Sequence, residues 1–97
     1  MFMTKHEEYY QKMIDENSEI FAQFMDIHDK YALDSSAWQI KFNEIGAKTV
    51  EIIRDWERRL CRQAERGQYG KFSDKLADKF WMLVRKDFPK IDFVGVS

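Results

Sequence analysis

Cysteine, proline and glycine are scarce in this chain, which has one cysteine, one proline and four glycines in 97 residues. The single cysteine, Cys61, excludes an internal disulfide framework. A chain with a single cysteine suits a reducing compartment, so we expect a cytoplasmic protein. An all-β domain would need several clusters of turn residues, and the sequence has none. The composition therefore favours helices.

Long apolar runs are also missing. No stretch approaches the ~20 apolar residues of a membrane-spanning helix, and the first residues lead directly into Lys5, His6, Glu7 and Glu8 rather than into a signal peptide. Large apolar side chains are nevertheless plentiful and periodic, with eight Phe, four Tyr and three Trp, which excludes disorder. We expect a soluble protein with no membrane contact.

Signatures of catalysis and of cofactor binding are absent from the sequence. The glycine-rich stretch 67–70 has neither the spacing nor the Lys-Ser/Thr pair of a phosphate-binding loop. Cys61 lacks the flanking residues of thiol enzymes, and no His-Glu-x-x-His or Cys-x-x-Cys pattern occurs. A chain this small also has little volume left for a ligand pocket. We expect no enzymatic activity, no catalytic residue, no metal site and no cofactor.

A long amphipathic helix is the clearest positive signal. Apolar residues recur every three or four positions, and at about 100° per residue they fall on one arc. Because this phase persists, we predict a continuous helix over about 36–66 with Trp56 in the core. Ser36 and Gln39 have capping-box spacing, so Ser36 is the predicted N-cap. The arc comprises Trp38, Phe42, Ile45, Thr49, Ile52, Ile53, Trp56, Leu60 and Ala64.

Two further helices and a tail are predicted around it. A capping box at Thr4 and Glu7 opens a helix over about 4–33, although the polar run 15–18 is a point at which it can break. A shorter helix over about 73–87 follows Gly67, which fits a helix C′ position, and is capped by Ser73 with Asp74. It ends before Pro89. The tail 89–97 alternates weakly and is predicted to be extended.

These elements predict one all-α domain over residues 1–97. The two long helices are of equal length, about 45 Å at ~1.5 Å per residue, and a short loop joins them, so we expect a long antiparallel hairpin. The shorter third helix makes the fold three-helix bundle-like. It covers only half of the groove between the other two helices.

Three polar residues, His6, Asn17 and His28, share the apolar arc of the first helix at a constant spacing of eleven. Eleven helical residues span about 16 Å, so no two of these side chains can bind the same metal ion on a straight helix. We therefore interpret them as hydrogen-bonded positions that set the register of packing.

The third helix carries an unusually wide apolar arc, about 160° against roughly 100° for an ordinary surface helix. Either the whole arc packs inside the protomer, or its edge contacts a second chain through aromatic anchors. The candidate interface consists of Ala77, Trp81, Val84 and Phe88. We predict a non-catalytic helical protein–protein interaction module that self-associates, with a homodimer or another protein as the assembly.

The alternative function depends on arginines of the 36–66 helix, namely Arg54, Arg58, Arg59, Arg62 and Arg66. Arginine suits bidentate phosphate contacts, so the alternative is a small nucleic-acid-binding or anionic-ligand-binding protein. Carboxylates such as Glu51 and Asp55 lie within the same face and weaken the electrostatic attraction. Nucleic acid is therefore the less favoured partner, and salt dependence separates the two functions.

Overall fold

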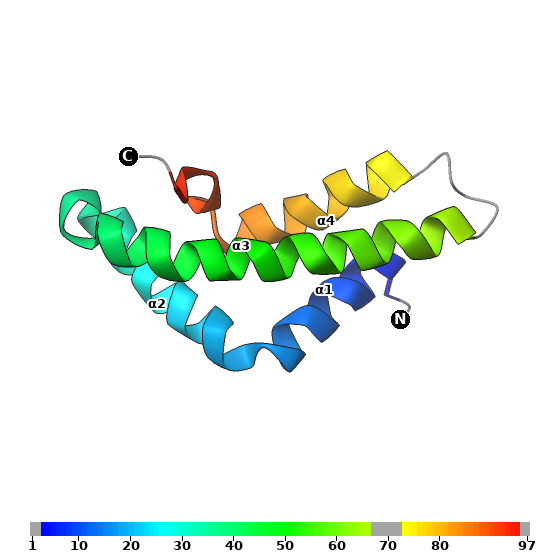
Figure 1. Ribbon diagram of the computed structural model, residues 1–97, viewed down its shortest axis with the longest axis horizontal. Coiled ribbons are helices and arrows are strands. Elements are labelled where there is room, and N and C mark those ends of the chain that lie inside the picture. Colours follow the sequence, from blue (N-terminus) through cyan, green and yellow to red (C-terminus); the bar gives the residue numbers. More distant parts are fainter. Residues whose placement is uncertain (1–2, 67–72, 96–97) are drawn as a thin grey trace.

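The long helix α3 (Ser35–Arg66) is the axis along which every other element packs (Figure 1). The computed structural model describes residues 3–66 and 73–95, with only the backbone for 64–66 and 73–74. This part of the chain is helical and contains no strand. The 32 residues of α3 form one uninterrupted helix, which confirms the predicted continuity. The predicted cap at Gly67 and the cap formed by Ser73 and Asp74 lie outside the described residues and side chains.

The predicted helix over 4–33 is wrong, because it is two helices. α1 (Lys5–Glu16) and α2 (Ser18–Leu33) meet at Asn17, whose backbone angles of φ −126° and ψ 35° are not helical. The Asn17 side chain donates to the Met13 carbonyl oxygen at 3.0 Å and so satisfies a carbonyl at the end of α1. The break falls in the polar run 15–18, and it gives the V shape seen below α3 in Figure 1.

The helix boundaries follow from their caps. Thr4 and Glu7 form the predicted capping box at the start of α1. At the start of α3, however, the Asp34 carboxylate accepts a hydrogen bond from the Ala37 N–H at 3.3 Å. Asp34 is therefore the N-cap, and the prediction of Ser36 is wrong by two residues. Residues 35 and 36 already belong to the first turn of α3.

The helix α4 (Ser73–Asp87) lies antiparallel to α3 and also contacts α1. On one side, the Tyr10 hydroxyl of α1 donates to the Asp87 carboxylate at 2.5 Å. On the other side, the Trp81 indole N–H donates to the Glu57 carboxylate of α3 at 2.5 Å. The wide apolar arc of α4 is thus used within the protomer, against two helices at once.

The core runs the length of α3 and is mostly aromatic. Near the C-terminal half of α3, the Tyr10 and Phe80 rings pack edge-to-face with their centres 6.0 Å apart. Near its N-terminal half, the ring centre of Phe24 lies 5.6 Å from that of Phe42 and 5.0 Å from that of Phe88. Trp56 is only 8% exposed, which confirms its predicted burial. The buried apolar residues are Tyr10, Met13, Phe21, Phe24, Ile27, Phe42, Ile53, Trp56, Leu60, Phe80, Val84, Phe88 and Ile91.

The predicted extended tail is instead folded back onto the helices. Residues 88–95, which we call the C-terminal strap, contain the 3-10 turn η2 (Ile91–Phe93), and Ile91 is 3% exposed. Val94 packs so closely on α3 that a Cβ added at Gly46 would lie 2.6 Å from one of its γ-carbons. The strap therefore fills the part of the groove that the short α4 leaves uncovered.

We predict that Asp34→Ala lowers the free energy of unfolding by about 1 kcal/mol, because the substitution removes the N-cap of α3. Ser36→Ala is the matched control and is expected to change it little. Chemical denaturation measures both. A loss of stability in the Ser36 variant alone would contradict the observed boundary.

We predict that Tyr10→Phe destabilises the fold by about 2 kcal/mol, because a hydrogen bond to a charged partner joins α1 to α4. Tyr9→Phe is the control, since the Tyr9 hydroxyl has no hydrogen-bond partner in the described part of the chain. Equal denaturation midpoints for the two variants would show that the bond to Asp87 adds nothing.

Candidate functional site

The arginines of the alternative function do not form one cationic surface. Arg58 and Arg59 both pair with Asp55, at 3.7 and 2.9 Å. Arg54 lines a different hollow, beside α4 and the strap. Arg62 is exposed and has no ion-pair partner among the described residues, and the side chain of Arg66 is not described. The described arginine side chains are therefore divided between two sides of α3, and the Asp55 carboxylate pairs with two of them, Arg58 and Arg59.

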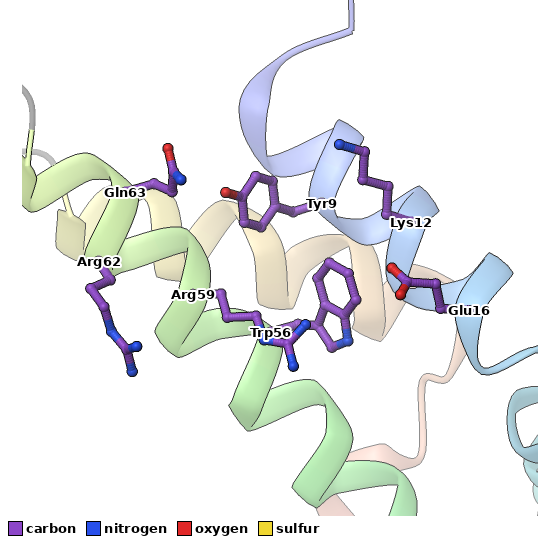
Figure 2. Close-up of a pocket in the computed structure, with 7 residues that line it drawn as sticks. All are labelled: Tyr9, Lys12, Glu16, Trp56, Arg59, Arg62 and Gln63. Carbon is purple, nitrogen blue, oxygen red and sulfur yellow. The ribbon is translucent and has the colours of Figure 1, made fainter.

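A groove of about 440 Å³ separates α1 from α3 at the C-terminal half of α3 (Figure 2). Tyr9 and Trp56 form its aromatic part, edge-to-face at 6.1 Å. The Arg59 guanidinium lies 4.7 Å from the Trp56 ring centre, whereas Figure 2 shows the Arg62 side chain turned away from Tyr9. The groove is lined by Tyr9, Lys12, Glu16, Trp56, Arg59, Arg62 and Gln63.

The electrostatics of this groove do not favour an anion. Lys12 already pairs with Glu8 at 3.1 Å, and Arg59 pairs with Asp55. The neighbouring hollow, which shares Trp56 with the groove, adds Glu51 to the lining. Because phosphate affinity depends on uncompensated positive charge, the geometry gives the anionic-ligand function little support.

The four residues of the predicted interface do not share an exposed surface. Val84 is 0% and Phe88 2% exposed, so the expectation that they meet a second chain at the edge of α4 is wrong. They are buried because α4 packs between α1 and α3 and its end turns into the strap. Ala77 and Trp81 are half-buried, and the polar edge of Trp81 is occupied by Glu57.

Large exposed apolar side chains gather instead near the end where α2 turns into α3. Leu33 is 89% exposed, Ile40 76% and Phe93 47%. We call these three residues the corner surface. A hollow of about 250 Å³ beside it is lined by Tyr31, Ala32, Ser35, Lys90 and Phe93, which places the strap next to the turn. Sequence reasoning missed this surface because Leu33 and Ile40 are single apolar residues out of phase with the predicted arcs.

The three polar residues of the predicted helix over 4–33, namely His6, Asn17 and His28, lie in three separate environments. His28 is 4% exposed, and its Nε2 accepts a hydrogen bond from the Lys90 N–H at 3.1 Å, while Nδ1 lies 3.2 Å from the Asp29 carboxylate. These bonds assign a neutral ring with its proton on Nδ1. Asn17 lies at the break between helices. Burial lowers the pKa of His6 at the other end, against the smaller opposing effect of Glu7.

His28 therefore fixes the strap to α2. In residues 3–66 and 73–95, no three His, Cys, Asp or Glu side chains are placed to hold a metal ion. No helix in the same ranges has the length and apolar character to cross a membrane. Comparisons with models of protein families, with curated proteins and with solved structures find no match.

We predict that reversing Arg58 and Arg62 to Glu changes the free energy of unfolding by at most about 1 kcal/mol, because both side chains are exposed. We also expect the wild type to bind duplex or single-stranded nucleic acid no more tightly than the double variant at low salt. Tight, salt-sensitive binding by the wild type that this variant loses would establish the alternative function.

Proposed function

We propose that this protein is a non-catalytic helical module that self-associates through the corner surface. The observation that supports this proposal is the exposure of Leu33, 89%, and Ile40, 76%, near one end of the molecule. Single exposed apolar residues are ordinary on protein surfaces. Here two exposed aliphatic side chains flank the turn between α2 and α3, and the exposed Phe93 lines an open hollow beside the same turn, a concentration of apolar surface that favours an interaction site.

Aromatic and cationic side chains lie at the same end of the molecule. Trp38, in the first turn of α3, is half-buried, and the ammonium groups of Lys30 and Lys41 lie 4.8 and 5.7 Å from its ring centre. Tryptophan is a frequent anchor in protein interfaces, and a polar rim excludes water around such anchors. The end of the molecule thus combines an apolar centre with amphipathic neighbours.

A second copy is the partner that this arrangement favours. Two-fold dimers are the commonest soluble oligomers, and their interfaces use the same patch on both subunits. Pairing of two corner surfaces removes apolar side chains of both copies from water, a gain of about 25 cal/mol for each Å² buried. This proposal keeps the self-association predicted from the sequence but moves it from α4 to the α2–α3 corner.

We predict that the wild type is a dimer at micromolar concentration and that Ile40→Lys yields a monomer with unchanged helical circular dichroism. The side chain is exposed, so the substitution leaves the core intact. Size-exclusion chromatography with light scattering measures the mass. Met82→Lys is the matched control, because Met82 is 67% exposed on α4 and is expected to leave the dimer unchanged.

A third variant distinguishes the two candidate surfaces. If Trp81→Lys dissociates the dimer while Ile40→Lys does not, the copies meet at α4, as the sequence predicted, and the corner surface is the wrong site. A wild type that scatters light as a monomer throughout the micromolar range contradicts self-association altogether.

A further inference from the structure

His28 is a buried titratable side chain at the point where α2, α3 and the strap meet. It is only 4% exposed, and its ring lies among three aromatic side chains. The ring centres of Phe24 of α2, Phe42 of α3 and Phe88 of the strap lie 6.0, 6.3 and 5.8 Å away. The packing of three elements therefore fixes where the two ring nitrogens point.

The two ring nitrogens of His28 have different partners. Nε2 accepts a hydrogen bond from the Lys90 N–H at 3.1 Å, and Nδ1 lies 3.2 Å from the Asp29 carboxylate. Only a neutral imidazole has a nitrogen that can accept a hydrogen bond. The bond that joins α2 to the strap therefore requires an uncharged His28.

Protonation of Nε2 removes this acceptor. An imidazolium donates from both nitrogens, so a ring N–H would face the Lys90 N–H, and two donors cannot bond to each other. At Nδ1 the carboxylate of Asp29 lies within ion-pair distance once the ring is charged. A proton that reaches His28 thus gains a partner on α2 and loses the partner on the strap.

The ring faces charged groups on two elements, α2 and the strap. On α2 the group is the Asp29 carboxylate, which favours the charged ring. On the strap the Lys90 side chain is exposed, and its ammonium lies 5.5 Å from the Phe93 ring centre. From α3 the imidazole is faced by the uncharged Phe42 ring. The strap and a solvent proton therefore compete for Nε2.

We propose that His28 is an acid-sensitive latch, meaning that its bond to Lys90 holds residues 90–95 near neutral pH and is lost on acidification. Histidine is the side chain whose charge changes between about pH 5 and about pH 8. Protonation breaks the Lys90 bond and loosens residues 90–95, while the buried Phe88 keeps the start of the strap in the core. The latch acts within one chain and does not depend on self-association.

Nuclear magnetic resonance of the full chain tests the latch. The ring signals of His28 report its protonation between about pH 7.5 and about pH 5, and the Lys90 amide reports the strap. We expect the hydrogen-exchange protection of this amide to fall about tenfold, the equivalent of one hydrogen bond. Its midpoint is expected to equal that of the ring. The direction follows from the competition, because the bond forms at the higher pH and is lost as pH falls.

His28→Gln keeps a side-chain acceptor but cannot take up a proton. We expect the protection of the Lys90 amide in this variant to be the same throughout the pH range. His6→Gln is the matched control, because His6 is the other histidine of the chain and lies at the start of α1. It is expected to respond to acid as the wild type does.

Each of three results overturns the latch: a Lys90 amide that is unaffected while the ring titrates, a ring that stays neutral down to about pH 5, or an acid response that His28→Gln retains. A loss of protection shared by the Ile53 amide, in the middle of α3, is global unfolding and also overturns it. If His28→Gln does not fold, the midpoints of the ring and of the Lys90 amide in the wild type decide the question.

Discussion

The apolar face of α3 is the constraint on which the rest of the structure depends. A helix of 32 residues presents a face about 48 Å long, and no other helix in the described residues is long enough to cover it. Several shorter elements together cover this face of α3. α1 and α2 divide its length at the Asn17 break, and α4 and the strap divide it again on the other side.

The junction between α4 and the strap links the fold to the proposed function. Where α4 ends, the groove is filled by a strap held by Phe88, Ile91, Val94 and two hydrogen bonds from its backbone. The strap therefore lies beside the corner surface, and Phe93 belongs to both. Self-association is proposed at the end where the strap and the α2–α3 turn lie side by side.

The sequence predicted what depends on local periodicity and failed where tertiary packing decides. The continuity of α3, the burial of Trp56 and the capping box at Thr4 all follow from spacing along one helix. The polar run 15–18 marked a point at which the first helix can break, but the apolar periodicity continues across it and predicted a single helix. The wide arc of α4 was correctly identified, whereas the burial of Phe88 depends on a strap whose path no local pattern indicates. The exposure of Leu33 and Ile40 could not be predicted from local patterns. It depends on which helix faces pack against one another, and only the structure gives that packing.

Hydrogen exchange measured at two protein concentrations tests the central claim most directly. Self-association at the corner predicts that amides within residues 33–40 and 90–95 become more protected as concentration rises. The Gly95 and Lys90 amides, which donate to Asn43 and His28, are the most informative. The exposed side of α4 around Met82 is predicted to stay unchanged. Protection that does not depend on concentration, or that changes only along α4, would contradict the account.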